Sequence, residues 1–415
     1  WLLSGVIIAR AEDAPAASLD QLTQQMKEGS AELRLAAIEG LGRLGAGAAP
    51  AVDGLIALLD DPDSNIRIAS AQALGAIGAP ARRAVPALLK RFTDLERNEA
   101  EVPVWHAAGE AVGKLGPDSL PELMKLLVSE DDIACHAAAV AIHGLGAEAK
   151  AAVPAVIDQL RQKSTRRIPM IYALMGMGPA AADAVPVLIK MLDVEDDFHV
   201  QYWACRALGQ VGLPAAQPAV KELVRLVRHP VASVRGNAAA ALGKLGPQVG
   251  EEAIAALAAA LKDKLYNVRR SAAIALGEMG PTAATAVPAL DAGLAREGFA
   301  ARSQAAVARW RITQEVEPSL VVLLSELQLR DGPWDAAEGF QQMGAEAAPA
   351  VDRLTKLFAS PLSETRLFAA SSLAGIGFPA KSALPQLREL TKDSDQDVRE
   401  VAAEAIQTIE KAQQP

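Results

Sequence analysis

Residues able to do chemistry, the histidines and the larger aromatic side chains, gather in one part of this 415-residue sequence. Positions 105 to 203 hold four of the five His, two of the three Tyr and two of the five Trp, although aromatic residues make up only 4% of the chain. Imidazole can transfer protons or bind metals, and aromatic side chains dominate the energetic hot spots of interfaces. The candidate partner-binding residues are Trp105, His106, His136, Tyr172, Tyr202 and Trp203.

A packing role is the alternative for these side chains. The segment RNEAEVPV lengthens the chain just before Trp105, and this indole would then fill a wider gap between helices. If the aromatic residues serve only as structural spacers, they should lie in the interior. If they form a recognition surface, they should be accessible.

Metal binding and catalysis are not expected. His136 and His143 are seven residues apart, which places their Cα atoms about 10 Å apart along one helix. A zinc ion holds imidazole nitrogens at about 2 Å, so such a pair would need extended side chains and a third ligand. The catalytic and haem-attachment patterns H-E-x-x-H, G-x-S-x-G and C-x-x-C-H do not occur. We therefore expect no metal, no cofactor and no enzymatic activity.

Two stretches resemble ligand-binding motifs. GLGRLG at 40–45 matches the dinucleotide fingerprint, but it neither follows a strand pattern nor opens a helix, as a pyrophosphate site requires. DSDQDVREVAAE at 393–404 has acids at calcium-loop positions, yet Val398 stands where the sharp turn of that loop needs Gly. We interpret the first stretch as part of a repeated pattern and the second as a helix N-cap.

A repeat must position all of these residues. An Ala-rich apolar segment ends in Gly at regular intervals, with Arg311 and Glu410 at two equivalent positions. Successive ends are 30 to 38 residues apart and cluster at 33 or 34, which gives twelve units from about Ser18 onward. The terminal glycines are Gly45, Gly78, Gly116, Gly146, Gly178, Gly212, Gly246, Gly280, Gly344 and Gly377.

Residues 50–84, PAVDGLIALLDDPDSNIRIASAQALGAIGAPARRA, show what one unit encodes. Pro50 suits the first turn of a helix, and Asp63 stands where a second helix needs an N-cap. Apolar residues at i, i+3, i+4 spacing give each helix one apolar face, and Gly78 ends the second helix. Because neither helix buries its face alone, neighbouring hairpins must stack. We predict an all-α fold, an α-solenoid of about twelve stacked helical hairpins over residues 18–415.

The units share the pattern (V/L)-P-x-L, a capped turn, and (I/V)-R-x-x-A-x-x-A-L-G-x-(I/L)-G, as in SVRGNAAAALGKLG and NVRRSAAIALGEMG. The tetratricopeptide and ankyrin signatures do not occur. The pattern resembles the short HEAT-like repeats first named from phycobilisome lyase subunits. The resemblance covers nearly the whole chain and implies a protein-interaction scaffold whose second helices line a concave face.

From this we expect a noncatalytic scaffold that binds another protein, or an extended segment of one, on the concave second-helix face. The alternative is an accessory subunit of a chromophore or cofactor lyase, with a planar ligand in the aromatic-rich zone of repeats 3–6. The resemblance does not choose between them, because the shared residues are packing positions. A visible absorbance band in the purified protein would favour the alternative.

An Arg recurs eleven residues before the terminal position of most units, and Trp105 takes its place in the third. In the first turn of a helix, Arg faces the positive end of the helix dipole at a cost of about 0.3–1 kcal/mol. We predict a compensating ladder of carboxylates in adjacent turns, with Asp63, Asp197 and Asp395 as candidates. These structural arginines are Arg34, Arg67, Arg167, Arg235, Arg269, Arg366 and Arg399.

Charge and cysteine content restrict the partners. The net charge of −9 and pI near 5.3 argue against nucleic acid, whose binding needs a dominant basic surface. The two cysteines, Cys135 and Cys205, lie in units too far apart for a disulfide. We expect each to behave as a small buried hydrophobe.

The first residues, WLLSGVIIARA, combine an apolar run with a cleavage-like Ala-Arg-Ala. We interpret residues 1–11 as part of a secretory signal or an N-terminal anchor, and residues 12–17 as a linker. About nine apolar residues are too few to span a bilayer, so we expect no membrane insertion of the mature chain. The expected location is periplasmic or extracellular, in a bacterium, or membrane-anchored if the segment is not cleaved.

Overall fold

The fold is built from helices alone in the part of the chain that the structure describes. This computed structural model describes residues 18–162, 166–193, 197–295, 301–329 and 333–412. Apart from one isolated bridge between Arg97 and Pro103, these ranges contain α-helices, 3₁₀-helices and turns. The all-α prediction is confirmed. The predicted signal or anchor at 1–11 and the linker at 12–17 lie outside the described residues.

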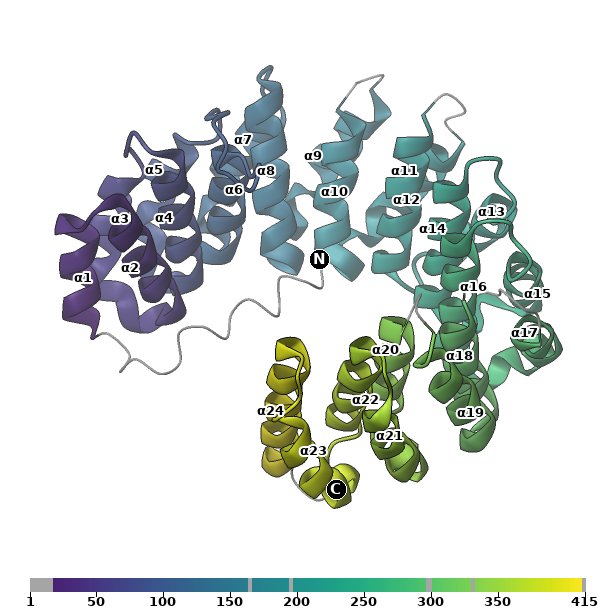
Figure 1. Cartoon of the computed structure of the whole chain (residues 1–415). Helices are drawn as coiled ribbons and strands as arrows, with labels where there is room; N and C mark the ends of the chain where they lie inside the picture. Colours follow the sequence, from purple (N-terminus) through teal and green to yellow (C-terminus); the bar gives the residue numbers. More distant parts are fainter. Residues whose placement is uncertain (1–17, 163–165, 194–196, 296–300, 330–332, 413–415) are drawn as a thin grey trace. The chain divides into compact units, whose positions relative to one another are not determined.

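The chain divides into two compact units, residues 1–194 and 195–415. In chain order, odd-numbered helices are the first helices of the repeats and even-numbered helices the second (Figure 1). The helices of the first unit are α1 (Leu19–Glu28), α2 (Ala31–Arg43), α3 (Val52–Leu58), α4 (Ser64–Ile77), α5 (Val85–Leu89), α6 (Val104–Leu115), α7 (Leu120–Leu127), α8 (Asp132–Leu145), α9 (Val153–Arg161), α10 (Arg167–Met177) and α11 (Val185–Leu192).

The second unit continues the same alternation from α12 to the C-terminal part of the chain. The helices of this unit are α12 (Phe198–Val211), α13 (Val220–Leu226), α14 (Ala232–Leu245), α15 (Glu251–Ala260), α16 (Tyr266–Met279), α17 (Val287–Leu294), α18 (Arg302–Thr313), α19 (Val316–Glu326), α20 (Pro333–Met343), α21 (Val351–Lys356), α22 (Ser363–Ile376), α23 (Leu384–Leu390) and α24 (Gln396–Lys411). The described ranges therefore hold twelve first and twelve second helices, as the repeat predicts.

Short 3₁₀-helices precede most first helices and carry the Ala-rich linkers between hairpins. Their small residues let the chain turn tightly while burying alternate alanines, such as Ala48 and Ala51. These segments are η3 (Gly45–Ala51), η4 (Ala79–Ala84), η5 (Pro117–Ser119), η6 (Gly146–Ala152), η7 (Gly178–Ala184), η8 (Gln217–Ala219), η9 (Pro247–Val249), η10 (Gly280–Ala286), η11 (Gly344–Ala350) and η13 (Phe378–Ala383), with η12 (Leu357–Ala359) inside the eleventh hairpin.

The terminal glycines end the second helices, as predicted. All ten have positive φ, from 53° to 107°, which is a conformation that glycine adopts without the Cβ clash of other residues. Where Arg311 replaces Gly, α18 runs on to Thr313 and Gln314 takes the left-handed conformation at φ 61°. GLGRLG lies at the C-terminal end of α2, so it has the geometry of the repeat and not that of a dinucleotide site.

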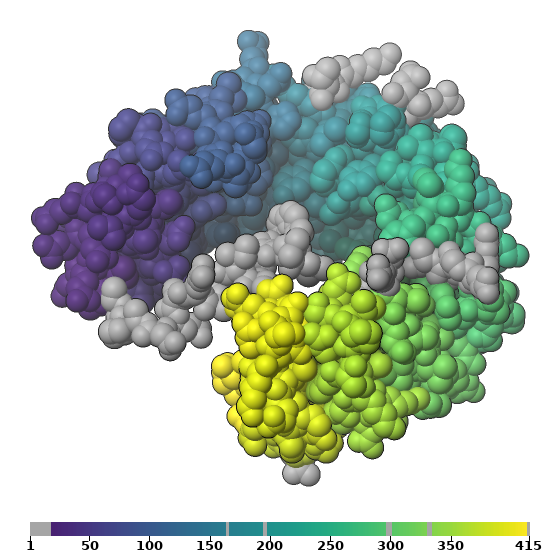
Figure 2. Space-filling model, viewed as in Figure 1, coloured from purple at the N-terminus to yellow at the C-terminus, as the bar shows by residue number. Residues whose placement is uncertain are grey.

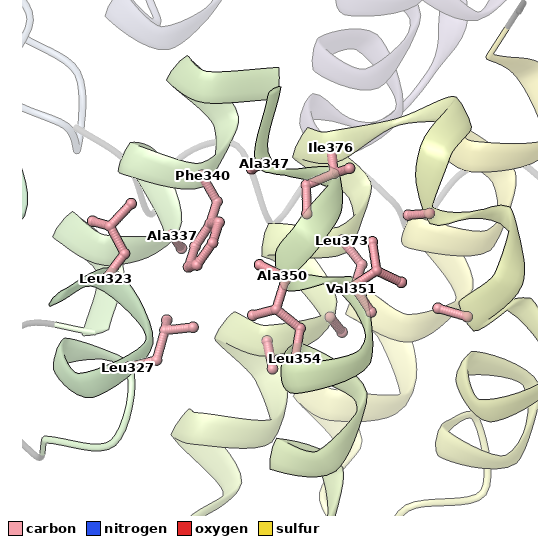
Figure 3. Packing of buried hydrophobic residues seen from close by; sticks show 14 of the residues in the cluster. Leu323, Leu327, Ala337, Phe340, Ala347, Ala350, Val351, Leu354, Leu373 and Ile376 are labelled. Carbon is pink, nitrogen blue, oxygen red and sulfur yellow. The ribbon is translucent and has the colours of Figure 1, made fainter. Parts of the chain in front are cut away.

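Within each unit the second helices pack on their neighbours, as α14 does on α12 and α16. The space-filling view shows the repeats following one another along each unit (Figure 2). Toward the C-terminus, Phe340 on α20, Leu354 on α21 and Leu373 on α22 belong to one fully buried apolar cluster (Figure 3). Such shared clusters replace the single central core of a globular domain.

Among the described residues, the predicted arginine ladder is present at four of the seven predicted positions, Arg34, Arg67, Arg235 and Arg366, and its carboxylates are not the predicted ones. Arg67 donates to Asp94 in the turn of the next repeat, with Nε 3.0 Å from Oδ2. It also donates to the carbonyl of Asp61 in its own turn at 2.8 Å. Arg235 and Arg366 bind Asp263 and Asp393 in the same forked manner, and Arg34 binds Asp61.

Asp63, Asp197 and Asp395 instead cap the helices that follow them. Each accepts a hydrogen bond from a backbone N–H in the first turn of α4, α12 or α24. The acids of 393–404 are thus used by the Arg366 ion pair and the α24 cap, which supports the N-cap interpretation of that stretch. Sequence spacing along one helix does not show which neighbouring turn a guanidinium reaches.

Two continuous helical runs, 132–161 and 167–192, are long and apolar enough to meet the criteria for a membrane span. Each run joins a second helix, a 3₁₀ segment and the next first helix, with a positive-φ glycine, Gly146 or Gly178, between them. A left-handed residue interrupts the α-helical backbone, so neither run is one straight helix. In the 18-residue apolar window of each run, 44% and 56% of the window is buried inside the protein.

Candidate functional site

The six candidate residues all lie on second helices, and all are partly exposed. Trp105 and His106 are on α6, His136 on α8 and Tyr172 on α10, in the first unit. Tyr202 and Trp203 are on α12, in the second unit. The structure therefore places them in separate groups, which are described unit by unit.

In the first unit, Trp105 brings two histidines together. Its indole meets the His106 ring edge-on at a centroid distance of 5.4 Å and the His136 ring at 6.3 Å. The backbone N–H of Trp105 donates to the carbonyl of Asp94, which connects the start of α6 to the turn that precedes the inserted segment. Edge-to-face rings at these distances attract each other beyond simple burial. These three residues form what we call the α6–α8 patch.

Glycines set the close approach of the helices beneath this patch. A Cβ on Gly109 would lie 2.8 Å from the carbonyl oxygen of Ala137, and one on Gly113 would lie 2.7 Å from that of Ala141. A Cβ on Gly176 would lie only 2.3 Å from the carbonyl oxygen of His143. Second helices α6, α8 and α10 therefore pack almost backbone to backbone, and their larger side chains are left at the surface of the stack.

Tyr172 does not join the α6–α8 patch; it pairs with His143. The two rings are parallel, with centroids 4.1 Å apart and an interplanar angle of 12°. His143 was not among the predicted binding residues, because its spacing from His136 suggested only a metal site. The pairing could have been suspected from the sequence, because both residues lie on second helices in consecutive repeats.

Hydrogen bonds fix the tautomers of two histidines. Nδ1 of His136 lies 2.6 Å from the carbonyl oxygen of Asp132, and Nδ1 of His143 lies 2.9 Å from that of Tyr172. A carbonyl oxygen only accepts, so each Nδ1 carries a proton, and in the neutral ring Nε2 is an acceptor. These rings can accept a hydrogen bond from a partner. No group of three or more metal-ligating side chains occurs in the described ranges.

In the second unit, Tyr202 and Trp203 form a cluster with Arg206 on the same helix. The two rings meet edge to face at 5.2 Å and 85°. The guanidinium carbon of Arg206 lies 5.0 Å from the Trp203 centroid and 5.6 Å from that of Tyr202, and Nη1 donates to the Tyr202 hydroxyl at 2.7 Å. Arg206 was not among the predicted binding residues, although its i, i+4 spacing from Tyr202 predicts this contact. We call the three residues the α12 cluster.

A small cavity adjoins the α12 cluster on the side of α14. It encloses about 200 Å³, and its polar lining is formed by Arg206 and Gln210 from α12 and by Asn237 and Lys244 from α14. Amide side chains both donate and accept hydrogen bonds, and the two cations attract acceptors. The cavity can hold a polar group next to Arg206, the residue that also contacts both aromatic rings.

Neither cysteine is a candidate nucleophile. Both thiols are free and buried. Burial raises the pKa of Cys135 and raises the pKa of Cys205 to about 12. Because the thiolate is the reactive form, both side chains act as small hydrophobes, as predicted.

The fold and these surfaces define a helical-hairpin solenoid that offers side chains on its second helices. This chain belongs to the HEAT-repeat family, whose profile matches residues 19–102, 153–225, 220–308 and 331–414. Solenoids of this family are typical protein-interaction scaffolds. No curated protein sequence matches the chain.

Solved structures share the fold at low sequence identity. In the Kap95:Nup1 complex, the match has a TM-score of 0.59 and 12% identity over 94% of this chain. Yeast importin-beta (Kap95p) matches with a TM-score of 0.57 and 11% identity, also over 94% of this chain. This chain spans 61% of each of those chains. The complex of CpcE and CpcF of phycocyanin lyase from Nostoc gives 23% identity over 68% of this chain and 97% of that one, with a TM-score of 0.35.

Proposed function

We propose that this chain is a noncatalytic binding scaffold that holds another protein, or an extended segment of one, against its second helices. The observation that carries the proposal is the α12 cluster: two aromatic rings and a guanidinium held in fixed contact while remaining partly exposed. Residues needed only for packing would be buried, as the alanines and leucines of the same helices are.

The side chains of the α12 cluster hold one another in place, which favours binding of a partner. The hydrogen bond from Arg206 to Tyr202 and its position over Trp203 restrict three side chains before any partner arrives. A partner then meets little loss of side-chain entropy on binding. Trp, Tyr and Arg are also the residue types most enriched among binding hot spots.

The cavity beside the cluster suits an extended peptide. Gln210 and Asn237 line it from two neighbouring repeats, so a segment crossing α12 and α14 would meet both amides. Such amides can pair with the N–H and C=O groups of a peptide backbone, while an apolar side chain lies on Trp203. By its name, the Kap95:Nup1 structure is a case in which a solenoid of this fold is engaged with another protein.

The α6–α8 patch supports a second contact area of the same kind in the first unit. Trp105 is partly exposed and holds His106 and His136 in ring contact. The imidazole of His136 presents an acceptor, as its tautomer requires. We also propose that the protein is exported to the periplasm or out of the cell, because residues 1–11 resemble part of a secretory signal.

No specific observation favours the alternative, a lyase accessory subunit with a planar ligand. The His143 and Tyr172 rings are already stacked on each other at 4.1 Å. The cavity beside Arg206 encloses about 200 Å³, which is below the roughly 300–1,000 Å³ of small-molecule pockets. A visible absorbance band in the purified protein would nevertheless redirect the proposal to that function.

Affinity capture from an extract of the source organism tests the proposal. The bait proteins are the parent, the variant Tyr202→Ala/Trp203→Ala/Arg206→Ala, and the control Phe198→Ala. Phe198 lies on the same helix and is 42% exposed, so the control removes an accessible aromatic outside the cluster. We expect a partner that the parent and the control retain and the triple variant loses at equal helicity. Equal retention by all three baits would contradict the role of the α12 cluster.

A further inference from the structure

Charge is distributed unevenly over the turns inside the hairpins. The turns before α4 and α8 are acidic, with the sequences LDDPDS at 59–64 and SEDD at 129–132. The turns before α14 and α16 are basic, with VRHPV at 227–231 and LKDKL at 261–265. These two basic turns belong to neighbouring repeats in a chain whose net charge is −9.

A cavity of about 480 Å³ lies between the two basic turns. We call it the turn cavity. Its apolar lining comes from Val227 and from the alanines of α15: Ala256, Ala259 and Ala260. Its polar lining is formed by Arg228, His229, Arg235, Lys262, Asp263 and Lys264.

The negative charge of Asp263, the one carboxylate of the lining, is already paired with Arg235. Asp263 accepts from Nε and Nη2 of Arg235 at 2.7 and 3.0 Å and from the backbone N–H of Leu265 at 2.9 Å. Burial alone would raise its pKa, but these hydrogen bonds and the charge of Lys264 lower the pKa of Asp263 below its ordinary value. The carboxylate therefore stays ionised and committed to the ladder, and it does not offset the remaining cations.

Three exposed cations remain. In the described ranges, the side chains of Arg228, Lys262 and Lys264 form no ion pair with a carboxylate. His229 adds no charge at neutral pH, because burial and the nearby Arg225 and Arg235 lower its pKa. Its Nδ1 accepts from the N–H of Val231 at 3.1 Å. The turn cavity is thus an apolar floor ringed by unpaired positive charge.

We propose that the turn cavity binds an acidic peptide segment of a partner protein. Its carboxylates meet Arg228, Lys262 and Lys264, and an aliphatic side chain between them lies on the alanine floor. Charge complementarity of this kind steers association and sets specificity. The proposal does not depend on the α12 cluster, whose residues do not line this cavity.

Peptide carboxylates fit this cavity better than a phosphate group. Arg235 is the buried guanidinium of the lining, and its nitrogens are used by Asp263 and by the carbonyls of His229 and Pro230. The guanidinium that the fold holds in place is therefore already used, and the remaining guanidinium, that of Arg228, is on an exposed side chain. The free cations stand on long side chains around an apolar surface, which suits several spaced carboxylates with a hydrophobic residue between them.

The test is fluorescence anisotropy at low ionic strength with a short labelled peptide in which Glu and Leu alternate. The titrated proteins are the full chain and its variant Arg228→Glu/Lys262→Glu/Lys264→Glu. We expect the variant to bind at least about tenfold more weakly, with added salt weakening the parent's binding. The Tyr202→Ala/Trp203→Ala/Arg206→Ala variant should bind this peptide as the parent does, which separates this site from the proposed function.

A matched variant controls for net charge. Lys221→Glu/Lys356→Glu/Lys411→Glu reverses three exposed lysines of the same unit outside the cavity. We expect it to keep at least half of the parent's affinity. The proposal is overturned if both triple variants lose affinity equally, if the peptide with Gln in place of Glu binds as well, if inorganic phosphate at equal charge displaces the peptide, or if the parent does not bind the peptide at all.

Discussion

The imidazole of His143 lies flat on the phenol ring of Tyr172, with centroids 4.1 Å apart and planes 12° apart. The stack joins two neighbouring repeats, since His143 is on α8 and Tyr172 on α10. It depends on Gly176, because a Cβ there would lie 2.3 Å from the His143 carbonyl oxygen. The two rings therefore meet because the backbones of α8 and α10 lie close together, and the backbones can lie this close because residue 176 has no side chain.

We predict that Gly176→Ala separates α8 from α10 and destabilises the first unit by about 1–3 kcal/mol, as overpacking does. The urea unfolding midpoint, followed by circular dichroism, measures the loss. Gly47→Ala is the control, since nothing lies within 4 Å of its Cβ position. If both variants unfold at the parent's midpoint, the close packing of α8 on α10 does not contribute to the free energy of unfolding.

The conformation of the terminal glycines predicts opposite effects for two substitutions at α14. Gly246 ends the helix with φ 78°, so Gly246→Ala should destabilise by about 1–2 kcal/mol. Gly236 lies inside the helix, and a Cβ there would meet its nearest atom at an ordinary 3.6 Å. Gly236→Ala should therefore stabilise by about 0.5–1 kcal/mol. Shifts of the same sign in thermal unfolding would refute this account.

Loss of a ladder arginine should cost far more than loss of a surface pair. Side chains of Arg235 and Asp263 are 9% and 13% exposed, so Arg235→Ala leaves a largely buried carboxylate without its partner. We expect roughly 3 kcal/mol of destabilisation. Arg388→Ala breaks a pair with Glu410 whose arginine is 62% exposed and should cost about 0.5 kcal/mol or less. Comparable urea midpoints for the two variants would argue against the ladder.

Glu326 predicts a pH dependence of stability. Burial raises the pKa of Glu326 above its ordinary 4.5; Arg302 opposes this and Asp335 adds to it. A raised pKa in the folded state means that the folded form binds the proton more tightly, so this group lowers stability as the pH rises from about 4.5 through the folded pKa. Glu326→Gln should therefore raise the urea midpoint at pH 7 and leave it unchanged near pH 4. An equal effect at both pH values would exclude ionisation as the cause.

The repeat was predictable because its signals are local. A glycine that ends a helix, an Asp that caps one and an Ala-rich face each act within one unit, so Gly78 and Asp63 indicate the hairpin without knowledge of its neighbours. The carboxylate partners of the ladder arginines could not be predicted from one repeat alone. Arg235 reaches Asp263 in the following repeat, and this distance across repeats is set by stacking, which the spacing along one helix does not contain.

In the candidate sites, too, contacts within one helix were predictable and contacts between repeats were not. Trp203 could be singled out by residue type, and Arg206 by its spacing from Tyr202, but the pairing of Tyr172 with His143 arises from the approach of two backbones. The turn cavity was overlooked because the net charge of −9 masks a basic surface confined to two turns. Comparing the turns with one another, repeat by repeat, would have revealed Lys262 and Lys264.

The ladder also has a mechanical meaning. Where Arg67 or Arg366 binds the aspartate of the next repeat, apolar packing and an ionic tie resist separation together. Where Trp105 occupies the ladder position, the guanidinium is replaced by a ring. We expect repeats that are joined by such an ion pair to resist separation more strongly than repeats that are joined by ring contacts, as at Trp105.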